Sequence, residues 1–119
     1  MDLNGHQILI VEDEIVVAMD LVCIIRDAGA EVVGPAMSAR EALRLIETHE
    51  ITAAIVDVNL GKEDSLPVAR RLDTAGIPFE FHTGNGDKLS PSPWPHAPII
   101  KKPAAPEKLI AAVAAVAKK

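Results

Sequence analysis

Short apolar runs alternate with longer amphipathic segments along the whole chain. Three runs, at residues 8–11, 53–56 and 98–100, are continuously apolar. Such runs are typical of strands that helices cover on both faces. Two less uniform runs, at residues 31–37 and 79–83, complete a set of five strands. The alternation predicts repeated βα units around a parallel sheet.

Four helices are expected between and after these strands. The first spans residues 14–28 and ends at Gly29, a residue suited to the left-handed conformation at a helix end. Ser38 and Glu41 form a capping box that begins the second helix. The third helix begins near Ser65 and stops at Gly76, and the fourth runs from about Pro106 to the end. The faces predicted to point inward or pack on the sheet in the last three helices are Ala42, Leu43 and Ile46; Val68, Ala69 and Leu72; and Leu109, Val113 and Val116.

The segment between Thr83 and Pro98 departs from this pattern. A fourth crossover helix belongs here, but Pro91, Pro93 and Pro95 exclude a regular long helix. We expect one or two helical turns around residues 87–90 and an extended stretch after them. The predicted fold is therefore a doubly wound, five-stranded parallel α/β sheet whose fourth crossover helix is short or missing.

Composition narrows the class of protein. A chain of 119 residues with 49% hydrophobic and 24% charged residues fits one globular domain, so residues 1–119 are interpreted as a single domain. The net charge of -5 argues against nucleic acid as a main partner. No apolar run reaches membrane-spanning length and no signal peptide is recognised, so a cytoplasmic location is expected. Cys23, the only cysteine, has aliphatic neighbours and is predicted to be a buried core thiol.

Polar side chains follow four of the five predicted strands. Glu12 and Asp13 follow the first, Asp57 the third, Thr83 ends the fourth, and Lys102 follows the fifth. In a doubly wound sheet, ligands bind beyond the carboxyl ends of the strands. With the flavodoxin-like strand order 2-1-3-4-5, the first and third strands are neighbours, so their three carboxylates converge and either take up protons or hold a cation. An all-oxygen ligand set favours Mg²⁺.

These residues resemble the site of the response-regulator receiver domains of two-component signalling, and the resemblance covers nearly the whole chain. It implies that Asp57 is the phosphoacceptor and Asp13 a direct metal ligand. It also implies that Glu12 acts on the metal through water and that Asn59 contributes its backbone carbonyl. Thr83 and Lys102 are then expected to contact the phosphoryl oxygens, with Pro103 following a cis peptide bond.

The chemistry of phosphoryl transfer gives these roles a physical reason. The transition state is loose, so catalysis consists mainly of positioning and of neutralising charge on the peripheral oxygens. Mg²⁺ and Lys102 supply positive charge, and the hydroxyl of Thr83 can donate one hydrogen bond to a phosphoryl oxygen. The chain is therefore interpreted as a signalling switch that catalyses only its own phosphorylation and dephosphorylation. Its expected partners are a sensor histidine kinase or phosphotransfer protein and a downstream protein.

Two departures from the receiver pattern leave an alternative open. Ile99 stands where receivers usually carry an aromatic residue, and the fourth helix is broken. Both features favour a pseudo-receiver, a binding module that works without phosphorylation. Phe81 to Gly84 also resemble the motif of an atypical stand-alone subgroup with Phe-Ala-Thr-Gly. Trp94 either docks on a partner when Asp57 is phosphorylated or covers the edge of the core.

Other motifs and single-residue interpretations are weaker. Asp57, Asn59 and Gly61 resemble the start of an EF-hand loop, but Lys62 occupies the glycine position. Residues 84–86 lack the third glycine of a dinucleotide loop, and the four histidines have no zinc-ligand spacing. Taken alone, Asp13 would more often be a helix cap and Lys102 a solvated lysine. Their combination at strand ends favours the switch.

Overall fold

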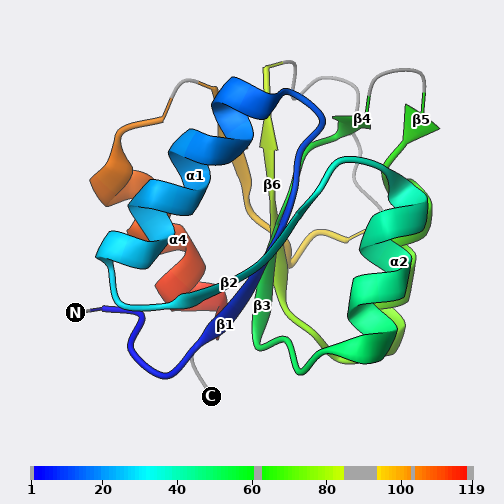
Figure 1. Ribbon diagram of the computed structural model, residues 1–119, viewed down its shortest axis with the longest axis horizontal. Coiled ribbons are helices and arrows are strands. Elements are labelled where there is room, and N and C mark those ends of the chain that lie inside the picture. The colour runs from blue at the N-terminus through cyan, green and yellow to red at the C-terminus, as the bar shows by residue number, and fades with distance from the viewer. Residues whose placement is uncertain (1, 61–62, 85–93, 103, 118–119) are drawn as a thin grey trace.

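The computed structural model describes residues 2–60, 63–84, 94–102 and 104–117 (Figure 1). At its centre lies a five-stranded sheet with the order β2-β1-β3-β6-β7, in which every neighbouring pair is parallel. Its strands are β1 (Gln7–Val11), β2 (Glu31–Ala36), β3 (Ala53–Val56), β6 (Phe79–Thr83) and β7 (Ile99–Lys101). The predicted five strands and their 2-1-3-4-5 order are confirmed, with β6 and β7 as the fourth and fifth strands.

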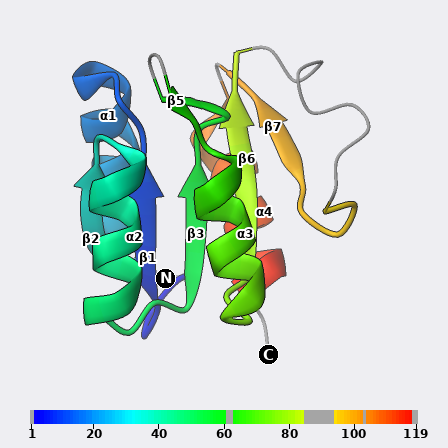
Figure 2. The same cartoon turned by 90° about the vertical axis from the view of Figure 1, so that its right-hand side faces the viewer.

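Helices cover both faces of this sheet. They are α1 (Ile15–Asp27), α2 (Ala39–Thr48), α3 (Leu66–Thr74) and α4 (Pro106–Ala117). Figure 1 shows α1 and α4 together on one side, and Figure 2 shows α2 and α3 side by side on the other. Each side encloses its own apolar cluster, because successive strand residues point to opposite faces. None of the helices in the described ranges is long and apolar enough to span a membrane.

Local signals in the sequence explain where the helices begin and end. The Ser38 Oγ accepts a hydrogen bond from the Glu41 N–H at 3.2 Å, as a capping residue does. The Glu41 side chain reaches one residue further back than in the usual capping box and accepts from the Met37 N–H at 3.0 Å. Gly29 (φ 103°) and Gly76 (φ 74°) follow α1 and α3 in the left-handed region. The predicted helix ends are confirmed to within one or two residues.

One prediction about a buried helix position is wrong. Cys23 is exposed, because the face of α1 that packs on the sheet consists of Ala18, Leu21, Val22 and Ile25. In α4, Leu109 and Val113 are buried and Val116 packs partly buried against the same cluster, as predicted, while Ala117 is a further buried position. In α1 the true period of the helix selects a face that neighbouring aliphatic residues obscure.

A short antiparallel ribbon, formed by β4 (Asn59–Leu60) and β5 (Glu63–Asp64), was not predicted. Asn59 pairs with Asp64, and Leu60 pairs with Glu63. The two strands are too short and too polar to show an alternating pattern. The ribbon lies in the connection between β3 and α3, where Figure 2 labels β5, and it begins two residues after Asp57 in the sequence.

Trp94 packs onto the sheet after the segment at 85–93. Its side chain is 7% exposed, and its ring lies edge-on to Phe79 at a centroid distance of 6.0 Å and tilted against Phe81 at 6.3 Å. Trp94 therefore covers the edge of the core, which was one of its two predicted roles. The helical turn predicted around residues 87–90 and the cis bond predicted before Pro103 lie outside the described residues.

Gly34 lies in the edge strand β2, where its pairing with β1 is irregular. The register shifts between Leu9 and Val11, and Gly34 has φ 98°. A Cβ at this position would lie 2.7 Å from the Ala36 N and 3.0 Å from the Ile10 O. Only glycine fits both the backbone conformation and the space.

Candidate functional site

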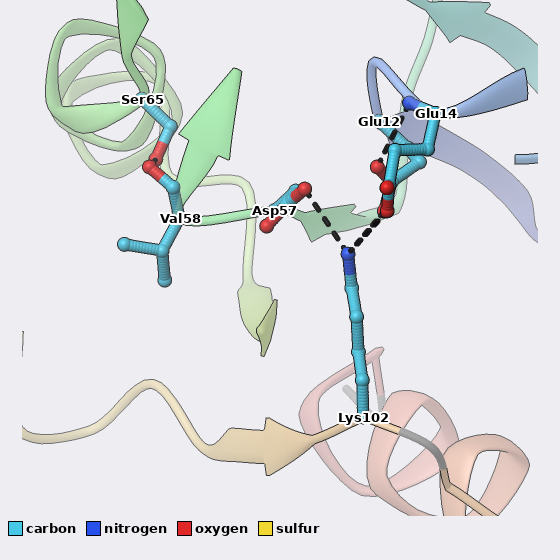
Figure 3. A network of polar contacts seen from close by, with 6 residues as sticks. All are labelled: Glu12, Glu14, Asp57, Val58, Ser65 and Lys102. Carbon is cyan, nitrogen blue, oxygen red and sulfur yellow. Dashed lines mark hydrogen bonds and ion pairs between the residues drawn. The ribbon is translucent and has the colours of Figure 1, made fainter. Parts of the chain in front are cut away.

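Three acidic side chains meet at the carboxyl edge of the sheet. Glu12 and Asp13 follow β1, and Asp57 follows β3 (Figure 3 shows Glu12 and Asp57). Each of the three offers a carboxylate oxygen, and these atoms all lie within 4.8 Å of one another. Glu12 and Asp57 are buried, while Asp13 is half-buried. The predicted convergence of the three acids is thus present in the structure.

Lys102 reaches this acidic group from the end of β7, the edge strand that β6 separates from β3. Its Nζ donates to the Glu12 Oε1 at 2.8 Å and to the Asp57 Oδ2 at 3.1 Å. The Glu14 Oε1 lies further away, at 3.9 Å. Figure 3 shows the lysine side chain extending from the end of β7 with its ammonium between the two buried carboxylates. This is the place predicted for Lys102.

Backbone hydrogen bonds extend the sheet up to the residues of the site. The Glu12 N–H donates to the Ala36 O, and the Asp57 N–H donates to the Val11 O, both at 2.9 Å. The Lys102 N–H donates to the Thr83 O at 2.8 Å. Because these bonds continue the pairing of adjacent strands, the side chains of Glu12, Asp57 and Lys102 emerge from rigid positions.

Burial and charge shift the protonation equilibria of this group. Burial raises the pKa of Glu12 to about 7, and the charge of Asp57 adds to this, while hydrogen bonds from Lys102 and the Glu14 N–H act in the opposite direction. Burial by itself would lower the pKa of Lys102, but its contacts with Glu12 and Asp57 outweigh burial and raise it. Lys102 therefore stays protonated. Its single positive charge does not balance the three neighbouring carboxylates when all of them are ionised.

The segment after Asp57 is tied to the beginning of α3. The Ser65 Oγ donates to the Val58 O at 2.9 Å, and this serine is fully buried (Figure 3). Sequence reasoning identified Ser65 only as the start of a helix. Asn59, predicted to offer a backbone carbonyl, begins β4 two residues after Asp57.

Thr83 and His82 lie at the end of β6, the strand next to β3. Thr83 is buried, at the carboxyl edge where it was predicted, and its backbone carbonyl receives the Lys102 N–H. His82 is also buried. Burial lowers the pKa of His82, and the nearby charge of Lys102 lowers it further. The imidazole is therefore neutral at neutral pH.

The acidic turn has a further role that the sequence did not reveal. Glu14 occupies the N-cap position of α1, but its side chain makes no capping hydrogen bond. Instead, the Glu14 N–H donates to the Glu12 Oε2 at 3.1 Å. The buried Glu12 thus accepts the N–H of the residue that precedes the helix and also contacts Lys102.

The donor set of this edge fits a hard divalent cation. Three carboxylates face a single ammonium, so the group retains negative charge when all three are ionised. Oxygen donors at this spacing suit Mg²⁺, which uses one or two carboxylates together with waters and phosphate oxygens. Glu12, Asp13 and Asp57 are the residues that would hold it.

Comparisons with known proteins agree with this arrangement. The family model described as the response regulator receiver domain matches residues 8–114. The transcriptional regulatory protein PdtaR of Mycobacterium tuberculosis is 36% identical over 72 residues, which are 60% of this chain and 35% of PdtaR. The chain thus matches only about a third of the length of this curated relative.

Solved structures share the fold over nearly all of the chain. SdrG from Sphingomonas melonis Fr1 has a TM-score of 0.82 and 39% identity, and the match covers 98% of both chains. The response regulator PhyR from Brucella abortus has a TM-score of 0.82 and 28% identity, and the match covers 93% of this chain and 47% of PhyR. Receiver domains are signalling modules that generally bind Mg²⁺ at an acidic cluster. With its parallel sheet, its acidic edge and a family match that spans most of its length, this chain belongs to the response regulator receiver domain family.

Proposed function

We propose that residues 1–119 form a single receiver domain in which Asp57 accepts a phosphoryl group with the help of Mg²⁺. The observation that carries this proposal is the contact of the Lys102 Nζ with both Asp57 (3.1 Å) and Glu12 (2.8 Å), beside Asp13. A buried acid that lies next to a fixed cation and two further acids is suited to a phosphoryl group and a metal ion.

The transfer step assigns a role to each side chain. An oxygen of Asp57 attacks the phosphorus of the donor, so a new O–P bond forms while the bond between the phosphorus and the donor breaks. The electron pair of the broken bond leaves with the donor group. Lys102 neutralises charge on the transferred phosphoryl oxygens. The hydroxyl of Thr83 donates a hydrogen bond to one of these oxygens and thereby reports the modification.

The acidic residues prepare the site for the metal. Glu12, Asp13 and the backbone carbonyl of Asn59 would hold Mg²⁺ together with Asp57. When bound, the ion supplies the positive charge that lets a phosphoryl group approach three carboxylates. Hydrolysis of the acyl phosphate returns Asp57 to its free state, so the only chemistry of the domain is its own phosphorylation and dephosphorylation.

The phosphodonor is a sensor histidine kinase or a phosphotransfer protein, and the output is a change of contacts with a downstream protein. Phosphohistidine is a high-energy donor whose imidazole takes a proton as it leaves. The domain works in the cytoplasm, where both partners of such an exchange are found. No nucleic-acid contact is proposed, since the net charge is -5.

The test is intact mass spectrometry after incubation with acetyl phosphate and Mg²⁺. Wild-type protein is expected to gain the mass of one phosphoryl group, and chelation of the metal is expected to abolish the gain. The Asp57→Asn variant is expected to gain nothing. Asp27→Asn, which removes an exposed acid at the end of α1, is the matched control and is expected to behave as wild type.

One observation favours a second candidate, the pseudo-receiver. Ile99 is 38% exposed on β7, at the position where receivers usually carry an aromatic residue, and its side chain cannot act as a hydroxyl-bearing ring does. A binding module would require neither Asp57 nor Mg²⁺. A wild-type protein that shows no mass gain with acetyl phosphate or with a phosphorylated phosphotransfer protein would establish this alternative and overturn the proposal.

A further inference from the structure

A fully buried acid lies in the centre of the sheet, away from the phosphoacceptor site. Glu80 is the second residue of the five-residue strand β6 and is 0% exposed. Neither of its carboxyl oxygens has a hydrogen-bond partner among the described residues. Buried polar groups are nearly always hydrogen-bonded, so an acid with two unpartnered oxygens requires an explanation.

Glu80 faces the side of the sheet that α4 covers. Its neighbours Phe79 and Phe81 belong to the apolar cluster beneath α2 and α3, so the alternation of side chains turns Glu80 to the opposite side. Its partner on β3 is Ile55, which belongs to the cluster that includes Leu109 and Val113 of α4. The carboxyl group is therefore enclosed by aliphatic side chains of the sheet and of α4.

No charged group in the described part of the chain compensates Glu80. The charged residues of α4, Glu107 and Lys108, are exposed, and so is Lys101 on β7. β3 contributes only Ala53–Val56. The remaining titratable group is His82, two residues further along the same face, and its buried Nδ1 also has no partner. Burial alone raises the pKa of Glu80 to about 8.

The two protonation states of Glu80 place different demands on the fold. Burying a neutral carboxylic acid without partners is unfavourable, because its polar atoms lose their hydrogen bonds to water. Burying an unpaired carboxylate is far more unfavourable, so the structure must either keep the proton or admit water. β6 is held by backbone hydrogen bonds to β3 and β7, whereas α4 is held on the sheet by side-chain packing. The element that can yield is therefore α4.

We propose that Glu80 is a proton-dependent latch for α4: the helix packs closely on β6 while the Glu80 carboxyl is protonated, and ionisation of Glu80 loosens the helix. The latch is a property of this chain's own β6, in which an acid occupies a position that the surrounding cluster would suit to an aliphatic residue.

The latch has a consequence for the phosphoacceptor site, and this part rests on the proposed function. α4 begins at Pro106, four residues after Lys102, and Leu109 lines the same cavity of about 470 Å³ as Lys102. Loosening α4 therefore frees the connection that aims Lys102 at Asp57. Phosphoryl uptake is then expected to fall as Glu80 ionises.

The test is hydrogen exchange of the α4 amides, expressed as protection factors so that the pH dependence of intrinsic exchange is removed. It is carried out at several pH values from below pH 4.5 to above pH 8, without Mg²⁺ or phosphodonor. In wild-type protein, α4 protection is expected to fall by up to about tenfold per pH unit between the ordinary pKa of 4.5 and the raised pKa of about 8, and to level off above it. The Glu80→Gln variant, which keeps the shape but does not titrate, is expected to show constant protection. Glu107→Gln, on the exposed side of α4, is the matched control and should follow wild type.

A second variant and a separate measurement of phosphoryl uptake complete the test. Because a glutamine amide would also lack hydrogen-bond partners at this position, Glu80→Leu is measured as a second variant, and it is also expected to show pH-independent protection. Constant α4 protection in wild-type protein, or equal loss in wild type and in both variants, would overturn the latch. Phosphoryl uptake by the same proteins is measured separately. Loss of protection without any uptake by Asp57 would contradict the proposed function and leave the latch standing, whereas normal uptake with constant protection would do the reverse.

Discussion

The ammonium of Lys102 lies 3.1 Å from the Oδ2 of Asp57, so the cation at the end of β7 contacts the acid at the end of β3 before any phosphoryl group is present. The same ammonium lies 2.8 Å from the Glu12 Oε1. Lys102 therefore contacts the same carboxylates that would bind a metal ion, and its positive charge repels such an ion. Its removal should affect metal binding and phosphoryl transfer in opposite directions.

We expect Lys102→Met to bind Mg²⁺ several-fold more tightly while its phosphoryl uptake slows by about a hundredfold, as for the loss of one fixed donor to a developing charge. Calorimetric titration with Mg²⁺ and the rate of mass gain with acetyl phosphate measure the two effects. Lys101→Met, which removes the exposed neighbouring lysine, should change neither. Parallel weakening of both properties would show that Lys102 organises the metal ligands rather than competing with the ion.

Ser65 anchors the segment that follows Asp57. Replacing Ser65 with Ala removes the buried hydrogen bond to the Val58 O (2.9 Å) and leaves that carbonyl with only the longer bond from the Ser65 N–H (3.3 Å). The free energy of unfolding is expected to fall by about 1–2 kcal/mol, as measured by urea titration. Thr48→Ala, which removes an exposed hydroxyl, should change it by less than about 0.5 kcal/mol. An equal fall in the free energy of unfolding in the two variants would show that Ser65 does not anchor the segment after Asp57.

Trp94 offers a direct test of its two predicted roles. Because its side chain packs against Phe79 and Phe81, Trp94→Ala is expected to lower the free energy of unfolding by about 3–5 kcal/mol. Urea titration followed by circular dichroism measures this loss without relying on tryptophan fluorescence. If the variant is as stable as the wild type, the result would instead support the role in which Trp94 docks on a partner protein.

Cys23 should behave as an accessible thiol. It is exposed on α1, so the native protein is expected to react with a thiol reagent at a rate close to that of the unfolded chain. The reaction is followed by the absorbance of the released chromophore, with and without denaturant, and Cys23→Ser provides the blank. Reaction only after denaturation would restore the original expectation of a buried core thiol.

The stability of the protein should depend on pH through Glu80. Its folded pKa of about 8 lies above the ordinary value of 4.5, so the folded protein keeps a proton that the unfolded chain releases. The stabilising contribution of this proton is complete below pH 4.5 and is lost as the pH rises through about 8. Relative to Glu80→Gln, the free energy of unfolding of the wild type should therefore fall across this window by at most about 1.4 kcal/mol per pH unit. Urea titrations at several pH values that give parallel curves for the two proteins would contradict the shift.

The sheet could be predicted because each strand carries a signal that survives without knowledge of its neighbours. The run Ala53–Val56 is apolar at every position, and the structure has the strand at those residues. Phe79–Thr83 was also found, although Glu80 and His82 interrupt its apolar character. The acids of the site followed from the same reasoning, since the carboxyl ends of parallel strands share one edge.

Other features depend on contacts that sequence patterns do not contain. Glutamate is rarely buried, so nothing predicts that the position of Glu80 is covered by a helix from the far end of the chain. The ribbon of β4 and β5 is too short to show any period. Cys23 is a different case, because helical spacing of Ala18, Leu21, Val22 and Ile25 already defines the buried face of α1 and excludes it. The aliphatic neighbours of Cys23 in the sequence do not determine its burial, whereas its angular position around the helix does.

The contact between Glu12 and Lys102 joins residues that are 90 positions apart. During synthesis the acids of the first and third strands leave the ribosome well before the lysine that neutralises them. On the proposed function, a growing chain is modified only slowly until β7 has joined the sheet, so domains with a complete sheet would take up nearly all of the phosphoryl groups.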